Sequence, residues 1–382
     1  MIGWFTEEER LIQNVVREFV NNEITKERIT EMENDQFPMD LWKRMLELGL
    51  VNVIIPEEAG GQGLGITVEN IIIYEIAKKS GMLACALDVQ SMAIRKIVSG
   101  ATPEQKEKFL QPIARGEKIC AFAWTEAAGG SNTAEWLDMG KMDGDEVVLN
   151  TTKVMISNNG VCDLYVINGT IDGVKSSVIV ERGTPGLEDG FFEHKMGLHG
   201  SMTGSVRLVN CRVPKANILD GSKPMPSVSH SFLNVATLSL GIADAALTQT
   251  KSFIMQRTKH GKPLATMQVV AQRIGELTTK LEMAKNFVFT YTKAWDEGKL
   301  DEYPLYNLYP YMAKSELTNV ALHIVLECMR LHGGLGYFED AGLARMYRDV
   351  TATVMVEFPA EVHREIIAVG VGMPAEATRF SF

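Results

Sequence analysis

Cysteine is scarce in this chain, and its spacing matches neither a metal centre nor a disulfide framework. There is no Cys-x-x-Cys pair, and the cysteines lie singly and far apart. Structural metal sites and disulfide-rich domains need closely paired cysteines. We therefore predict reduced packing residues and no metal site. The five cysteines are Cys85, Cys120, Cys162, Cys211 and Cys328.

Long apolar runs and an excess of positive charge are also missing. No apolar run approaches the ~20 residues that span a bilayer, and residues 1–10 read as the acidic start of a helix, without the order of a signal peptide. The formal net charge is -10, so nucleic acids and anionic membranes repel the chain overall. We predict a cytoplasmic protein whose main partner is neither nucleic acid nor a membrane.

The length and composition are those of a multidomain globular enzyme. Of the 382 residues, 46% are hydrophobic and 23% are charged. A chain of this length exceeds what one hydrophobic core organises, which predicts two or three domains.

Residues 1–118 are predicted to form an all-helical domain, because apolar residues recur there at intervals of three and four. Thr6 and Glu9 have the spacing of a capping box, and Thr102 followed by Pro103 is a second helix start. The glycine-rich segment 56–65 lacks the lysine of a phosphate-binding loop, so we interpret it as a structural turn.

The hydrophobic period changes at residue 119, and residues 119–225 are predicted to form a β domain. Short alternating runs are separated by Asp-Gly and Pro-Gly turns, which favours an antiparallel barrel or sandwich. The predicted strands are 121–124, 146–149, 153–156, 164–167, 177–180 and 205–208.

Helical periodicity returns after residue 225. Three long segments, 232–258, 268–297 and 305–331, together with a last helix over 360–371, predict a C-terminal four-helix bundle in residues 226–382. The predicted fold class is therefore α+β and multidomain, with a helical domain, a middle β domain and a helical bundle.

One acidic residue stands out near the C-terminus. Glu357 closes the apolar and hydroxyl run 350–356, two residues before Pro359. A carboxylate with apolar neighbours is poorly solvated when charged, so its basicity rises and it becomes a candidate proton acceptor. The other interpretation is a carboxylate that faces the N-terminus of the next helix. Glu361 and His363 are the competing candidates for a base.

Six motifs follow one another along the chain. They are Thr125-Glu-Ala-Ala-Gly-Gly-Ser131-Asn, Lys153-Val-Met-Ile-Ser157-Asn, Arg257-Thr-Lys-His-Gly-Lys-Pro263 with Gln268, Gly333-Gly-Leu-Gly-Tyr337, Tyr347-Arg-Asp349, and the stretch that contains Glu357. With these motifs in this order, the chain resembles the acyl-CoA dehydrogenase family along nearly its whole length.

The resemblance implies a reaction and a set of roles. Dehydrogenating an acyl thioester needs a base for the α proton and an acceptor for the β hydride on opposite sides of one bond. In the family the base stands at the position of Glu357, and the hydride passes to N5 of FAD. Thr125, Met155 and Ser157 would then adjoin the flavin, with Ser131 at the substrate. Without the resemblance, Thr125 and Ser157 are equally well ordinary strand-end hydroxyls.

A second group of residues is implied to hold the nucleotide part of FAD. The group is Arg257, Gln268, Arg330, Gly333 and Gly334. Arg257 would meet the pyrophosphate of a neighbouring subunit, and the two glycines would let the backbone approach the dinucleotide. The family's shared flavin implies a homodimer or homotetramer. The other interpretation of Arg257 is a solvated arginine at the end of a helix, and that of Gly333 and Gly334 is a plain helix C-cap.

The chain also departs from the family pattern. Phe358-Pro359 replaces Gly-Thr after the base, Met155 replaces the Trp that covers the flavin, and Phe232 stands where an Arg usually contacts the nucleotide end of CoA. The substrate is therefore either an acyl-CoA or an acyl, or α-hydroxyacyl, thioester on an acyl carrier protein. The expected electron acceptor is a flavoprotein or oxygen. A flavin-poor, non-catalytic binding subunit is a further alternative.

Overall fold

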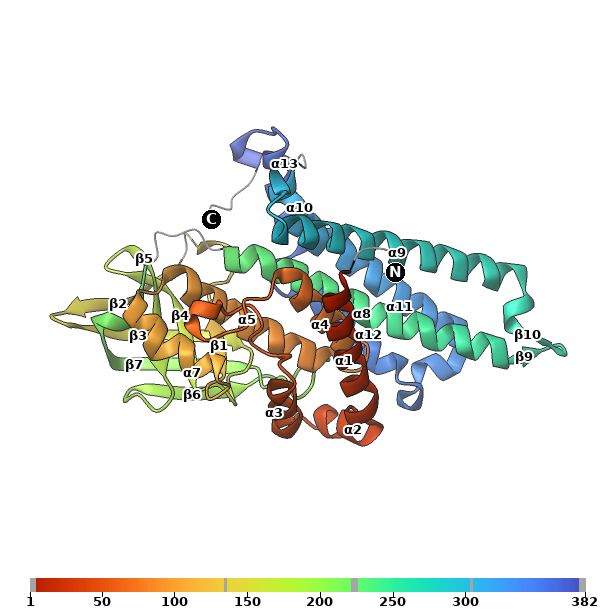
Figure 1. Ribbon diagram of the computed structural model, residues 1–382, viewed down its shortest axis with the longest axis horizontal. Helices are drawn as coiled ribbons and strands as arrows, with labels where there is room; N and C mark the ends of the chain where they lie inside the picture. The colour runs from red at the N-terminus through yellow and green to blue at the C-terminus, as the bar shows by residue number, and fades with distance from the viewer. Residues whose placement is uncertain (1–4, 134–135, 221–225, 303–304, 378–382) are drawn as a thin grey trace.

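The computed structural model describes residues 5–133, 136–220, 226–302 and 305–377. The strands gather at one end of the elongated molecule, and the long C-terminal helices extend to the other (Figure 1). The N-terminal helices lie along the middle and contact both. This arrangement confirms the predicted fold class.

The N-terminal region is helical, as predicted. Its helices are α1 (Glu7–Glu23), α2 (Lys26–Glu33), α3 (Met39–Glu47), α4 (Ile66–Ala77), α5 (Gly81–Gly100), α6 (Pro103–Gln105) and α7 (Gln111–Ala114), with the π-helical turn η2 (Lys106–Leu110) between the last two. The Thr6 hydroxyl accepts from the Glu9 amide at 3.2 Å, and the Glu9 carboxylate accepts from the Thr6 amide at 2.8 Å. Thr102 and Gln105 make the same reciprocal pair, so both helix starts are confirmed.

Helix α2 was not among the predicted elements. Met32 is its one fully buried residue, so it has almost no apolar period to detect. The glycine-rich segment is a compact turn that contains the 3-10 turn η1 (Glu57–Ala59). A Cβ on Gly61 would lie 2.1 Å from the Ile55 carbonyl oxygen, so this residue must be small for the turn to close.

The middle region is one connected sheet. Its strands are β1 (Cys120–Ala123), β2 (Asp138–Asp143), β3 (Glu146–Ile156), β4 (Leu164–Ile171), β5 (Val174–Glu181), β6 (Leu187–Phe192), β7 (Gly204–Pro214) and β8 (Ile218–Leu219), and their order is β6-β7-β3-β2-β4-β5-β8 with β1 also on β4.

Two details of the sheet differ from the prediction. The runs 146–149 and 153–156 are one long strand, β3, whose pairing with β7 shifts register between Leu149 and Thr151. Most pairings are antiparallel, but β1 and β2 both run parallel to β4. The alternation of side chains does not reveal strand direction, because the period of two is the same in both kinds of pairing.

The C-terminal region is the predicted four-helix bundle with a different fourth member. Its helices are α8 (Pro226–Gln256), α9 (Gln268–Asp296), α10 (Tyr309–Met312), α11 (Thr318–His332), α12 (Leu343–Met355) and α13 (Ala360–Gly370), with a short hairpin of β9 (Thr258–Lys259) and β10 (Lys262–Pro263) between α8 and α9. The π-helical turn η8 (Ala313–Leu317) joins α10 to α11.

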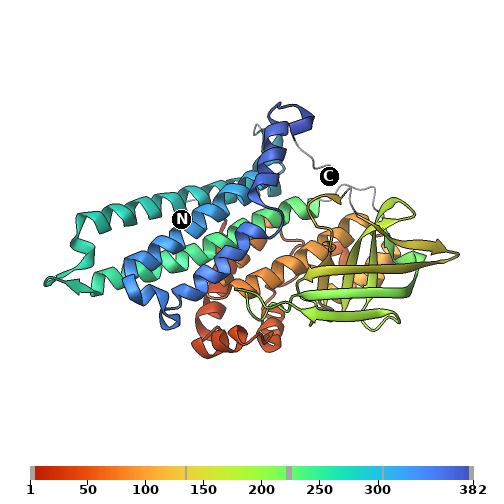
Figure 2. The same cartoon turned by 180° about the vertical axis from the view of Figure 1, so that it is seen from behind.

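Helix α12 packs on α8 and α11 and completes the bundle, whereas α13 packs on α10 and η8. Figure 2 shows α13 standing away from the long helices. We predicted α13 as the fourth helix, and this was wrong because 350–356 reads as one apolar run. Its helical period becomes visible only in the buried set Met346, Val350 and Thr353.

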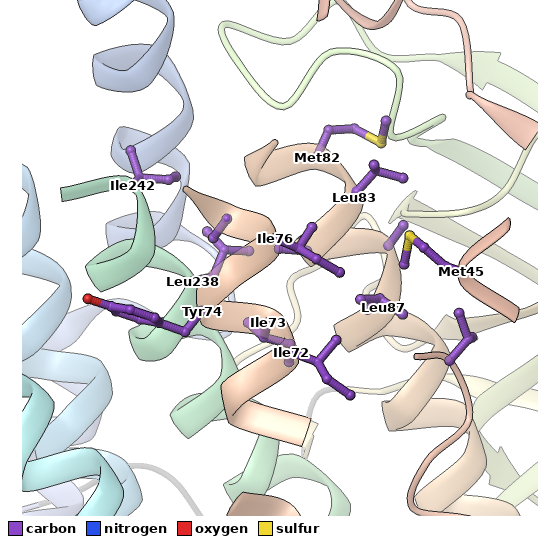
Figure 3. Close-up of a cluster of buried hydrophobic side chains, with 14 of the residues drawn as sticks. Met45, Ile72, Ile73, Tyr74, Ile76, Met82, Leu83, Leu87, Leu238 and Ile242 are labelled. Atoms are coloured by element: carbon purple, nitrogen blue, oxygen red, sulfur yellow. The ribbon is translucent and has the colours of Figure 1, made fainter. Parts of the chain in front are cut away.

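The core centres on α4, every residue of which is buried. Its isoleucines pack against Leu83 and Leu87 of α5 and against Leu238 and Ile242 of α8 (Figure 3). The Tyr74 hydroxyl donates to the Asp244 carboxylate at 2.8 Å. These contacts hold α5 and α8 side by side.

Helix α8 is long and apolar enough over Ser229–Gln256 to cross a membrane, but 83% of its most apolar window is buried inside the protein. That burial is typical of a core helix. All five cysteines are free, and four of them are buried, which agrees with packing roles.

Candidate active site

A cavity of about 310 Å³ opens between the sheet, α5, α8 and the turn that joins α12 to α13. Five of the predicted site residues line it: Thr125, Ser131, Met155, Ser157 and Glu357. Apolar side chains from α5 and α8 form much of the remaining wall, among them Met92, Phe232 and Val235. The structure therefore brings the predicted base and the predicted flavin neighbours to one place.

Glu357 lies in a strained turn. Its φ is 52° and that of Phe358 is 71°, so two consecutive residues with side chains adopt the left-handed conformation. Such residues persist where the surroundings enforce them, and they gather at functional sites. The turn points the Glu357 side chain away from both flanking helices and toward α8.

Two buried side chains hold this turn through its carbonyl groups. The His363 Nε2–H donates to the Glu357 carbonyl at 2.9 Å, and the Lys314 ammonium donates to the carbonyls of Phe358 at 3.3 Å and Val354 at 3.4 Å. Burial lowers the pKa of Lys314 to about 8 and that of His363 to about 4. His363 is therefore neutral near pH 7, while Lys314 supplies a positive charge close to Glu357.

The Glu357 carboxyl is enclosed, although part of the residue borders the open cavity. Its Oε1 accepts from the Ser231 hydroxyl, and its Oε2 is buried without a hydrogen-bond partner among the described residues. Burial raises the pKa of Glu357, and the hydrogen bond from Ser231 and the charge of Lys314 oppose part of that rise. A buried acceptor oxygen without a partner is costly unless something fills its place.

The competing interpretations of this segment fit less well. The Glu357 carboxylate is bonded to a side chain of α8 and not to the amides that begin α13. The Glu361 side chain is 75% exposed beside Arg364, and the His363 Nε2 is used by the backbone. Of the three candidates, Glu357 alone has its acidic group enclosed at the cavity.

Thr125 and Ser131 belong to a loop that is held from several sides. The Trp124 indole donates to the Gly130 carbonyl at 2.8 Å, and the Val154 amide donates to the Thr125 carbonyl at 2.9 Å. A Cβ on Gly130 would lie 2.8 Å from the Thr125 hydroxyl oxygen, so the chain must approach that hydroxyl closely. The loop is therefore rigid where it borders the cavity.

A buried ion pair lies behind the same loop. The Lys153 ammonium is 2.6 Å from the Glu126 carboxylate, and it also lies over the Trp136 ring. Breaking such a pair leaves an uncompensated buried charge, which is strongly destabilising. Lys153 therefore anchors the loop to β3.

Met155 and Ser157 lie at the end of β3 and just beyond it. Met155 has a φ of 57° and is 59% exposed, although it is large and apolar. The Ser157 hydroxyl is 3.3 Å from the Thr203 hydroxyl. Met155 offers an apolar surface to a flat ring, and the hydroxyl groups of Ser157 and Thr203 and the enclosed Glu357 carboxyl suit polar ring edges. These residues therefore fit a flavin.

The other predicted residues lie at the far end of the bundle. Arg257, Gln268, Arg330, Gly333 and Gly334 are all exposed, and the β9–β10 hairpin beside them marks the end opposite the sheet (Figure 1). Stacking of Phe253 on His332, with ring centroids 4.1 Å apart, joins the ends of α8 and α11 there. A Cβ on Gly333 or Gly334 would meet nothing within 4 Å. Within one chain, the predicted residues thus form two separate groups, one at the cavity and one at the far end of the bundle.

Residues that the sequence analysis missed surround the Glu357 carboxyl. They are Asp88 on α5, Ser231 and Asn234 on α8, and Lys314 on η8. Asp88 recurs at helical spacing with Cys85 and Met92, which also line the cavity. A charged residue on such a face could have been noticed, but its partner in α8 is 143 positions away.

Comparison with known proteins agrees with this fold. Family models of the acyl-CoA dehydrogenase N-terminal, middle and C-terminal domains match residues 6–117, 121–211 and 225–372. Acryloyl-CoA reductase (NADH) of Anaerotignum propionicum is 33% identical in an alignment 377 residues long that covers 95% of this chain and 94% of the relative. The CarC subunit of the caffeyl-CoA reductase-Etf complex of Acetobacterium woodii is 31% identical, covering 96% and 98%.

The solved structure of butyryl-CoA dehydrogenase from Megasphaera elsdenii superposes with a TM-score of 0.90 at 27% identity, covering 97% of this chain and all of the other. Together the fold and the family matches define a flavoprotein oxidoreductase. The chain belongs to the acyl-CoA dehydrogenase family. FAD is the cofactor of that family, which confirms the predicted cofactor and enzyme class.

No group of three or more His, Cys, Asp or Glu side chains that could hold a metal ion is found within residues 5–133, 136–220, 226–302 and 305–377.

His363 makes the stability of the turn depend on pH. The unfolded chain takes up a proton at this residue below about pH 6.5, while the folded chain does so only near pH 4. The unfolded state therefore gains protons first as the pH falls, and the native state loses up to about 3 kcal/mol across that window. We expect His363→Gln to flatten the fall of the unfolding free energy between pH 7 and pH 4, measured by urea denaturation.

His323→Gln is the matched control, because His323 is partly exposed on α11. It should leave that slope as in the wild type. Burial also lowers the pKa of His230, to about 3, so His363→Gln should remove only part of the slope. An unchanged slope in His363→Gln would show that His363 does not govern this transition.

Proposed function

We propose that the chain is an FAD-dependent acyl-thioester dehydrogenase in which Glu357 removes the α proton of the substrate. The supporting observation is the buried Oε2 of Glu357, which has no hydrogen-bond partner within the described ranges of the chain and lies at a cavity bordered by Thr125, Met155 and Ser157. The free oxygen is the one that can accept a proton, because Oε1 is already engaged by Ser231.

The residues on the cavity wall account for the proton half of the reaction. Burial raises the pKa of Glu357, which strengthens the carboxylate as a base, and the Lys314 charge keeps it ionised. The left-handed turn fixes the carboxyl in one orientation, so little reorganisation is needed at the moment of transfer. Apolar residues such as Met92 and Val235 exclude water from the bond that reacts. When bound, FAD supplies the hydride acceptor.

The same residues serve the reverse reaction. A protonated Glu357 returns its proton to the α carbon, since the forward and reverse steps pass through one transition state. Two relatives carry the name of a reductase, and the direction in the cell follows from the redox partner. We propose an electron-transferring flavoprotein as that partner, because one relative is a subunit of an Etf complex. Oxygen is the other candidate.

We propose that the exposed group at the far end of the bundle holds the nucleotide part of the cofactor of a second subunit. Arg257 donates to phosphate oxygens in this arrangement, and Gly333 and Gly334 leave the backbone open for close approach. Arg330 is paired with Glu327 at 2.6 Å, so its contribution is smaller. The protein is then a homodimer or homotetramer.

Glu357→Gln keeps the shape of the side chain and removes the proton acceptor. We expect turnover of an acyl thioester to fall at least ~100-fold, which is the lower end of what a general base contributes. Flavin content, measured by absorbance, should stay as in the wild type. Glu361→Gln is the control, because its exposed side chain should leave turnover unchanged. Near-normal turnover in Glu357→Gln would overturn the assignment.

Arg257→Ala should lower flavin content and weaken the oligomer together, since one cation serves a cofactor that crosses the subunit boundary. Arg257→Lys should restore only part of both, because an ammonium cannot reproduce a bidentate fork. Native mass spectrometry reports both quantities. Arg115→Ala removes an exposed arginine elsewhere and is the control. Full flavin in a stable Arg257→Ala oligomer would make Arg257 a surface residue only.

A second candidate is the same oxidation of an acyl or α-hydroxyacyl group carried by an acyl carrier protein. It is favoured by Phe232, which occupies the position of the usual CoA-binding Arg. Phe232 and the neighbouring Ser231 are both buried, and Phe232 packs on Phe358 and His363. The position of Phe232 therefore provides no positive charge for the nucleotide end of CoA.

Anaerobic reduction of the bound flavin separates the two substrates. The same acyl group is presented on CoA and on a phosphopantetheinylated carrier protein, and the loss of flavin absorbance is followed. Comparable or faster bleaching by the CoA thioester supports the first function and ends the carrier candidate. Bleaching by the carrier thioester alone does the opposite.

A further inference from the structure

A second buried carboxyl lies one hydroxyl group away from Glu357. Asp88 on α5 is 3% exposed. The Ser231 Oγ is 3.0 Å from its Oδ1, 2.9 Å from its Oδ2, and within hydrogen-bond distance of the Glu357 Oε1. The Asn234 amide donates to the Asp88 Oδ1 at 2.9 Å. Of these groups, only Ser231 enters the reaction described above, through its hydrogen bond to Oε1; Asp88 and Asn234 have no role there.

The orientation of Asn234 is set by its own neighbours. The Asn70 amide donates to the Asn234 Oδ1 at 3.1 Å, and the Thr237 hydroxyl in turn donates to the Asn70 Oδ1 at 2.5 Å. The Asn234 nitrogen must therefore face Asp88. Two questions remain: in which direction the Ser231 hydroxyl points its hydrogen, and whether the Asp88 Oδ2 carries a proton.

The number of hydrogens available between Ser231 and the two carboxyls shows whether one carboxyl is protonated. A serine hydroxyl has one hydrogen and can donate to one carboxyl only, yet it bridges two. If both carboxyls were ionised, one of these contacts would set a lone pair against a lone pair in a buried site. Ser231 can make one hydrogen bond with each carboxyl when one of the two carboxyls keeps its proton. The chain then runs from the Asp88 Oδ2–H to the Ser231 oxygen, and from the Ser231 hydrogen to the Glu357 Oε1.

The charges around the pair place that proton on Asp88. Lys314 on η8 and Arg95 on α5 both favour the ionised form of Glu357. Asp88 has only the neutral donors Ser231 and Asn234, and Glu69 on α4 adds negative charge. Burial and the Glu357 charge raise the pKa of Asp88 well above its ordinary value.

The remaining titratable groups that face Asp88 and Glu357 are neutral or already form an ion pair. Arg95 is itself paired with Glu69. Burial raises the pKa of the neighbouring Cys85 thiol to about 12, and His363 is neutral near pH 7. The pair with one proton thus carries a single negative charge opposite Lys314.

We propose that Asp88 and Ser231 are positioning residues of the reaction, and that a protonated Asp88, acting through the Ser231 hydroxyl, holds Glu357 ionised with its Oε2 free to take the α proton. This inference rests on the proposed role of Glu357 as the base. One hydrogen bond orders the next, so the orientation of the base is fixed before the substrate binds. No net proton is gained or lost by the relay until Glu357 takes one from the substrate.

The proton on Asp88 is tested by infrared difference spectroscopy of the flavin-loaded protein at pH 7. The difference between wild type and Asp88→Asn should show the C=O stretching band of a protonated carboxyl in the wild type only. This measurement does not depend on turnover, so it stands even if Glu357→Gln proves active and the proposed function fails. Carboxylate bands without that C=O band would overturn the inference.

The positioning role is tested by the pH dependence of kcat below pH 7. Ser231→Ala removes a hydrogen bond to a charged acceptor, so kcat should fall about 10-fold and the acid limb should move about one pH unit higher. Ser231→Thr, which keeps the hydroxyl, should restore most of both. Asp88→Leu should act as Ser231→Ala does, and Asp88→Asn should recover much of the loss because its amide can donate to Ser231.

A purely structural role gives a different pattern. Asp88→Leu would then lower the melting temperature but leave the acid limb of kcat in place, and that result would overturn the inference. Should Asp88→Leu fail to fold, the Ser231→Ala and Ser231→Thr pair decides alone. An acid limb that is the same in Ser231→Ala and the wild type would also overturn it.

Discussion

The candidate active site depends on one short turn, in which Glu357 and Phe358 both adopt the left-handed conformation. Residues with side chains avoid this region unless their surroundings enforce it. Here the enforcement comes from Lys314 and His363, which are buried and donate to three carbonyl groups around the turn. The strain has a use, because it turns the carboxyl out of the helical path and toward the wall of the cavity.

That wall exists because α5 and α8 are held side by side by the fully buried α4. The facing sides of α5 and α8 carry apolar contacts, and they also carry Asp88 and Ser231. Polar groups at such depth cost free energy unless each has a partner. Hydrogen bonds link Asn70 to Asn234, Asn234 to Asp88, and Asp88 to Ser231, so each of these groups has a partner. Ser231 contacts the Glu357 Oε1, and the Glu357 Oε2 has no partner among the residues that the structure describes.

The sheet contributes the opposite side of the cavity. Its loop from Thr125 to Ser131 is tied down by Trp124, Val154 and the buried pair of Lys153 with Glu126. Met155 is thereby kept exposed at the edge of the cavity. The cavity is thus built from all three regions of the chain, and none of them encloses the Glu357 carboxyl by itself.

The resemblance to the family made Thr125 and Ser157 candidates. Local patterns in the sequence determined the helical, β and helical order, the capping boxes at Thr6 and Thr102, and the candidacy of Glu357. These features depend on neighbours within a few positions, where periodicity and capping chemistry act. Only the tertiary structure decided that α12 and not α13 completes the bundle, that β1 and β2 run parallel to β4, and that Asp88 and Lys314 belong to the site. Ser231 and Asp88 are 143 positions apart, and no local period records which buried polar groups will meet across a packed core.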